Sequence, residues 1–81
     1  MARRSPSHAY TPELVALGAA IRASRKSRGM SQEDLANASS LDRSYMGGLE
    51  RGEHNPTLMT ILRLASTLGV KASILLSDSG L

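Results

Sequence analysis

The sequence lacks cysteine, phenylalanine and tryptophan, and Tyr10 and Tyr45 are its only tyrosines. Without cysteine the chain can form neither disulfides nor thiolate metal sites, which fits a reducing cytoplasm. Its two histidines, His8 and His54, are too few for an ordinary zinc centre, so we expect no metal and no cofactor. Because β-branched residues are scarce as well, a β-sheet is disfavoured.

Long apolar runs are also missing. No stretch approaches the roughly 18 residues that a membrane span needs, and the first four residues are not followed by the apolar stretch of a signal peptide. We find no nucleophile–base pair, no cluster of metal ligands and no phosphate loop beyond a weak Gly-Gly-x-x-x-Gly spacing at 47–52. The sequence therefore argues against an enzyme, a membrane protein and a small-molecule binder.

Helix-forming residues are abundant, with 12 leucines, 10 alanines and 4 methionines in 81 residues. Net charge is +3, but six of the ten basic residues and only one of the seven acids precede Met30. A basic end of this kind favours an anionic partner, of which nucleic acid is the usual one. Charge that serves solubility explains the same excess about as well at this point.

Capping residues divide the chain into five predicted helices. Thr11 followed by proline, Ser31 with an acid three residues later, Asp42, and Thr57 each have the chemistry of an N-cap; the Asn-Pro pair at 55–56 is an equally legal start for the fourth helix. Glycines at 29, 52 and 69 mark helix ends. The expected helices cover about 12–28, 32–38, 43–51, 58–68 and 70–76.

Short connections between these helices predict an all-α, compact five-helix bundle. The second and third helices, joined by a tight turn, have the helix-turn-helix pattern. We expect residues 1–10 to form a disordered basic arm, 11–77 the folded domain with a C-terminal dimerisation helix, and 78–81 a frayed tail.

Fixed spacing over forty-odd residues carries a resemblance to a known family. The residues that carry this resemblance are Arg25, Gly29, Ser31-Gln32, Leu35-Ala36, Leu41, Tyr45, Leu49-Glu50-Arg51-Gly52, Pro56, Leu58 and Leu68. Over about residues 14–76 the chain resembles the Xre family of phage-repressor and Cro-type helix-turn-helix regulators, and residues 41–52 are similar to the controller proteins of restriction–modification systems. The resemblance implies a regulator that binds double-stranded DNA.

A helix that enters the major groove reads bases with the outward side chains of its first turns. In this sequence these are Arg43 and Ser44, and Arg43 can donate two hydrogen bonds to guanine. An arginine in the first turn of a helix opposes the helix dipole, which is easier to explain beside a polyanion than on an ordinary solvated surface.

Other residues are expected to contact the DNA backbone or to hold the fold. For Tyr45 partial burial is compatible with a phosphate contact. For His54 a loop position without any function is as plausible as a contact to the DNA backbone. The two glycines at 47 and 48 suggest either close approach of backbone to DNA or a partner helix, or simple tolerance of a weak helix. The expected backbone contacts are Gln32, Tyr45, Gly47, Gly48, Arg51, His54 and Asn55.

Two further expectations concern structure. The resemblance implies an ion pair between Arg25 and Glu50 that orients the third helix. Ser40 stands where the family prefers glycine, so we expect slight strain in the turn there. A homodimer would bring two such helices to successive major grooves of a near-palindromic site. Its interface is expected on apolar residues that could equally close the bundle, namely Leu68, Val70, Ile74, Leu75 and Leu76.

Two functional hypotheses remain open. The first is a sequence-specific DNA-binding transcriptional regulator that acts as a homodimer without catalysis. The second is a protein-interaction module on the same scaffold, such as an antitoxin that masks a toxin.

Overall fold

The computed structural model describes residues 9–81, and this range contains five helices and no strand. The helices are α1 (Pro12–Ser27), α2 (Gln32–Ala38), α3 (Arg43–Glu50), α4 (Leu58–Leu68) and α5 (Ala72–Asp78). The all-α prediction is confirmed. Apart from Ala9 and Tyr10, the expected N-terminal arm lies outside the described residues.

Four helices begin at a side chain that accepts a hydrogen bond from a backbone amide three residues later. Thr11, Ser31, Asp42 and Thr57 each do so at 2.9–3.4 Å. At Ser31 the capping box is complete, because its backbone amide also donates to the Asp34 carboxylate at 2.9 Å. Local chemistry therefore fixes where these helices start, as the sequence predicts, and Thr57 rather than Asn55 is the cap of α4.

The fifth helix differs from its expected bounds. It begins at Ala72 and ends at Asp78, about two residues later at each end than the sequence indicates. Lys71 at its N-cap makes no side-chain capping bond, so no residue type marks the boundary. The tail is also ordered by hydrogen bonds, since the amides of Ser79 and Leu81 donate to carbonyls of the last turns of α5.

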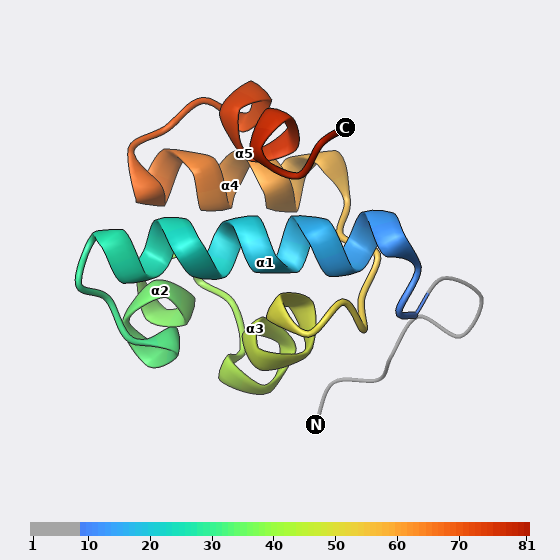
Figure 1. Ribbon diagram of the computed structural model, residues 1–81. Coiled ribbons are helices and arrows are strands. Elements are labelled where there is room, and N and C mark those ends of the chain that lie inside the picture. Colours follow the sequence, from blue (N-terminus) through green and yellow to red (C-terminus); the bar gives the residue numbers. More distant parts are fainter. Residues whose placement is uncertain (1–8) are drawn as a thin grey trace.

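The helices lie in two groups on either side of α1 (Figure 1). In Figure 1, α2 and α3 lie on one side of α1, whereas α4 and α5 lie on the other. Helix α1 contacts α3 and α5, and α2 contacts both α3 and α4. As a result, α3 has one side against α1 and α2 and its other side toward solvent.

All five helices contribute to one core. Its buried members are Leu17, Ile21, Leu35, Ala36, Met46, Leu49, Leu64, Ala65, Leu68 and Leu75. Leu68 and Leu75 are at most 1% exposed, so their assignment to a dimer interface is wrong: they close the bundle of their own chain. Conversely, Leu58 and Leu62 of α4 are 64% and 43% exposed.

Helices α1 and α3 approach each other closely at Gly18. A Cβ atom at this position would lie 2.4 Å from the carbonyl oxygen of Leu49 and 2.6 Å from that of Glu50. Contacts of this length do not occur, so only glycine lets the end of α3 rest directly on α1. This glycine sets the depth at which α3 sits.

The turn between α2 and α3 contains a serine in the left-handed region. Ser40 has φ 56°, a conformation that favours glycine. The amide of Leu41 then donates to the carbonyl of Ala36 at 2.8 Å and closes the turn. The strain expected at Ser40 is therefore present, and the turn holds α2 and α3 at a fixed angle.

Candidate nucleic-acid interface

The first turn of α3 faces solvent. Arg43 and Ser44 are both exposed, and the Arg43 guanidinium makes no ion pair with any described residue. Asp42 before them is used as the helix cap and accepts from the amide of Tyr45 at 3.1 Å. The structure thus presents one arginine and one hydroxyl at the outward start of the helix.

The opposite side of α3 is fixed by a buried ion pair. Arg25 of α1 donates from Nε to Glu50 Oε2 at 2.7 Å and from Nη2 to Glu50 Oε1 at 3.0 Å. Its Nη1 donates to the carbonyl of Met30 at 2.8 Å. The hydrogen bonds to Glu50 raise the pKa of Arg25, with burial acting in the opposite sense. The ion pair expected between these residues is present, and it ties the end of α3 to α1.

Gln32 extends this network to α2. Its Nε2 donates to Glu50 Oε1 at 3.0 Å, so one carboxylate holds side chains from two other helices. The side chain is half-buried and lies at the edge of α3. Gln32 therefore has a bracing contact that the sequence does not indicate, beside the phosphate contact expected for it.

His54, in the loop after α3, packs against the helix. Its ring stacks on Tyr45 with centroids 4.6 Å apart and an interplanar angle of 13°. A Cβ at Gly48 would lie 2.5 Å from His54 Nε2, so the ring covers the α-carbon of this glycine. Burial lowers the pKa of His54, an effect that the charge of Glu53 partly opposes.

This packing corrects two predicted contacts to the DNA backbone. His54 is 4% exposed and Gly48 is buried beneath it, so neither faces a partner. Gly48 is a glycine because the imidazole needs its space. The pair of glycines inside a helix was a usable signal, but the sequence does not say which side chain fills the space.

Gly47 is buried as well, so the contact to the DNA backbone predicted for it is also corrected, but its neighbours differ. A Cβ there would lie 3.2 Å from Arg51 Nη1 and 3.6 Å from Gln32 Oε1. Arg51 itself forms an ion pair from Nε to Glu53 Oε2. The structure therefore brings Gln32, Gly47 and Arg51 together on one side of α3.

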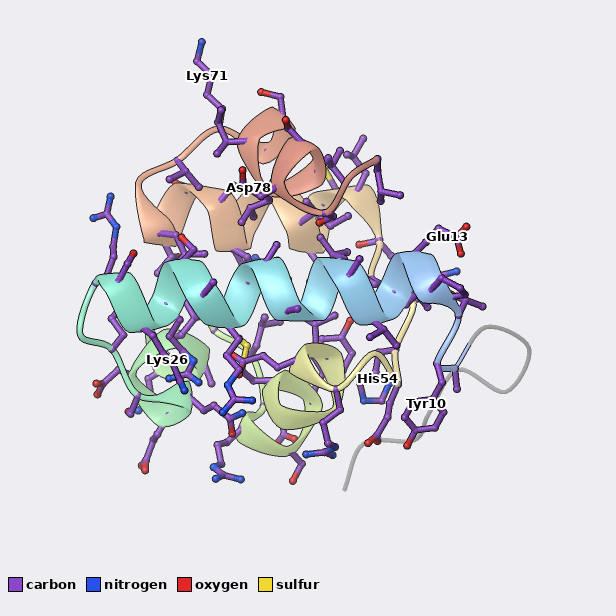
Figure 2. The ribbon with its side chains drawn as sticks, viewed as in Figure 1. Tyr10, Glu13, Lys26, His54, Lys71 and Asp78 are labelled. Carbon is purple, nitrogen blue, oxygen red and sulfur yellow. The ribbon has the colours of Figure 1, made fainter. Side chains whose placement is uncertain are left out.

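The start of the described chain lies against the end of α3. The amide of Tyr10 donates to the carbonyl of Gly52 at 2.7 Å, and Figure 2 shows Tyr10 near His54, beside the first turn of α1. Residue 10 is thus part of the folded domain rather than of a disordered arm. Asn55, two residues beyond Glu53, is exposed in the same loop.

Within residues 9–81, no three His, Cys, Asp or Glu side chains gather as a metal site would require. No single helix of this range is long and apolar enough to cross a bilayer; α4 and α5 together meet the criterion by composition but bend by 98° between them.

A braced pair of helices with an exposed first turn on the second defines a helix-turn-helix domain. The model of the helix-turn-helix family matches residues 21–75, and the chain belongs to this family, in its Xre type.

Three relatives support this membership. The chain is 37% identical over 65 residues to the immunity repressor protein of Bacillus phage phi105, covering 80% of this chain and 45% of that protein. It is 43% identical over 61 residues to the control protein C.SmaI of Serratia marcescens, covering 75% and 73%. The crystal structure of the restriction-modification controller protein C.AhdI from Aeromonas hydrophila superposes with a TM-score of 0.79 at 46% identity, covering 80% of this chain and 98% of that one.

Proposed function

We propose that this protein is a transcriptional regulator that binds double-stranded DNA sequence-specifically as a homodimer, with α3 in the major groove of a near-palindromic operator. The observation that carries the proposal is the asymmetry of α3. Its inner side is locked by the Arg25–Glu50 pair, whereas its first outward turn offers Arg43 and Ser44 to solvent. The controller and repressor proteins to which the chain is similar support the same assignment.

Base recognition falls to the first turn of α3. The major groove is about 12 Å wide and admits one helix. The Arg43 guanidinium can donate to guanine O6 and N7 together, which discriminates by about 1–3 kcal/mol against a wrong base. Ser44 can donate or accept and is less selective. Since Gly47 and Gly48 present no side chain one turn later, DNA shape contributes the remaining specificity.

Phosphate contacts position the protein on the duplex. We assign them to residues that lie around α3 at the surface, with the buried His54, Gly47 and Gly48 left out. These residues are Gln32, Tyr45, Arg51 and Asn55. Tyr45 is half-buried on its His54 side, and burial raises the pKa of its phenol, so the hydroxyl stays protonated and able to donate at neutral pH.

The second copy is proposed to pack on apolar side chains that the bundle leaves uncovered on α4 and α5. Leu58, Met59, Leu62 and Ile74 are 43–67% exposed, and of the residues first expected there only Ile74 is exposed, with Val70 and Leu76 half-buried. Helices α4 and α5 lie across α1 from α3 (Figure 1), so dimerisation there leaves both copies of α3 accessible.

Selection from random duplexes followed by sequencing tests the function, because it reports the preferred site, its symmetry and its half-site spacing together. Arg43→Ala should abolish the preference for the selected site while leaving thermal stability nearly unchanged. Lys71→Ala is the matched control: it removes the same charge from an exposed residue on the far side of α1 (Figure 2). Equal losses on selected and random DNA would contradict a base-reading role for Arg43.

Sedimentation of the wild type and of Met59→Glu tests the dimer. A charge placed within the interface should give a monomer that keeps its fold and binds half-sites weakly. A wild type that is monomeric at micromolar concentration, or a dimer indifferent to this change, would refute the assigned surface.

A further inference from the structure

Arg51 lies where a side chain at position 47 would otherwise project. Its Nη1 is 3.2 Å from the Cβ position of Gly47, and Gln32 Oε1 is 3.6 Å from the same point. The guanidinium therefore folds back along α3, although the Arg51 side chain remains 60% exposed. The missing side chain of Gly47 provides the room for this conformation.

Glu53 holds the arginine in this conformation. Its Oε2 accepts from Arg51 Nε, and the two side chains differ in exposure, 15% for Glu53 and 60% for Arg51. The backbone of Glu53 is itself anchored, because its amide donates to the carbonyl of Gly48 at 2.9 Å. The Tyr10 side chain also donates a hydrogen bond to the Glu53 carboxylate, and Tyr10 is anchored by its amide to Gly52. A constrained carboxylate thus orients an accessible guanidinium.

We propose that Glu53 is a positioning residue that orders Arg51 across Gly47, beside Gln32, as a donor to a phosphate of bound DNA. This inference rests on the proposed function. The Nε atom is occupied by Glu53, which leaves both Nη groups to donate side by side to phosphate oxygens, a geometry that arginine favours. The residue that makes the contact and the residue that orders it are two positions apart in sequence.

Two opposing effects of Glu53 must be separated in any test. Ordering Arg51 before binding strengthens the complex by about two- to tenfold, the range that corresponds to one long side chain immobilised in advance. The negative charge of Glu53 acts against this, because it repels the polyanion. A variant that removes both the charge and the hydrogen-bond acceptor mixes the two effects.

Glu53→Gln and Glu53→Met form the matched pair that separates them. Both are neutral and similar in length, but only glutamine keeps an oxygen that accepts from Arg51 Nε. Binding of each full-length variant to the selected duplex is measured as a function of salt. We expect Glu53→Gln to bind about two- to tenfold more tightly than Glu53→Met. Equal affinities of the two variants would overturn the inference.

The same pair in an Arg51→Met background completes a double-mutant cycle. If Glu53 acts through Arg51, the difference between glutamine and methionine disappears there; if it persists, Glu53 acts on the fold or on DNA directly, and the inference is wrong. Circular dichroism melts of each variant confirm that folded protein is compared.

Gly47→Ala gives an independent readout. Alanine is the better helix former by about 1 kcal/mol, and its Cβ displaces only the flexible end of Arg51, so thermal stability should rise while DNA affinity falls about two- to tenfold. Unchanged affinity would contradict the inference. Failure of the proposed function looks different, because the wild type would then show no preferred duplex or no loss with Arg43→Ala.

Discussion

Two arginine–glutamate pairs meet at the end of α3 and differ in burial. Glu50 turns inward to Arg25, and these side chains are 2% and 9% exposed, whereas the next residue, Arg51, turns outward to Glu53, with 60% and 15% exposed. The inner pair is shielded from water and fixes the helix. The outer pair remains hydrated and screened, so it is available for binding rather than for stability.

Breaking the inner pair should have the largest effect. Glu50→Ala leaves Arg25 as a buried, unpaired cation and removes the acceptor of Gln32, which should cost about 3–5 kcal/mol of unfolding free energy. Arg51→Ala, the outer counterpart, should change the same quantity little. Urea denaturation followed by circular dichroism measures both. Comparable losses for the two variants would abolish the distinction between the pairs.

The next largest effect is expected at Gly18, where α1 supports α3. Alanine there places Cβ against backbone oxygens of Leu49 and Glu50, which cannot rotate away, so α3 must move off α1. We expect a loss of about 1–3 kcal/mol from this overpacking. Ala19→Gly, an exposed substitution on the same helix, should cost less, about 1 kcal/mol through helix propensity alone. Thermal melts that rank these two variants in the reverse order would contradict the close approach.

A smaller loss is expected at Gly48. Alanine there must displace the His54 ring from its place on Tyr45, because its Cβ would lie 2.5 Å from Nε2. The change should lower stability by about 1 kcal/mol, in spite of the better helix propensity of alanine. Gly47→Ala one residue earlier should have the opposite sign. The two melting temperatures, measured side by side, test whether Gly48 packs against the buried His54 ring and Gly47 against the flexible end of Arg51.

The smallest effect is a pH dependence at His54. Burial lowers its pKa below the ordinary 6.5, so the unfolded chain binds a proton that the folded chain resists. The contribution of neutral His54 is therefore intact above about pH 6.5 and declines as the pH falls toward the lowered value. His54→Phe keeps an aromatic ring against Tyr45 and should reduce the slope of stability between pH 7 and 5. An unaltered slope would show that other groups carry it.

Much of this fold could be predicted from the sequence because the interactions that specify its helices are local. Thr11, Ser31, Asp42 and Thr57 specify helix starts through bonds to amides three residues away, and apolar spacing specifies which side turns inward. Where such a signal is lacking, as at Lys71, the predicted boundary was wrong by two residues.

The remaining features depend on contacts between distant residues. Nothing in the order of residues indicates that Leu68 and Leu75 are in the core while Leu58 faces water, because this depends on how α4 crosses the bundle. Likewise, the burial of His54 requires the loop after α3 to fold back on Gly48. The exposure of Arg43 followed from its position along α3 and the inner ion pair from the family resemblance, whereas the partners of Gln32 and Arg51 followed from neither.

The left-handed Ser40 has a practical consequence for experiments on α3. Its conformation suits glycine and strains serine, so Ser40→Gly relieves the strain without altering any side chain that faces the helix. In a background stabilised by Ser40→Gly, destabilising substitutions in α3 could be assayed on molecules that still fold. The sharp corner between the two helices is thereby a point at which thermal robustness can be adjusted separately from recognition.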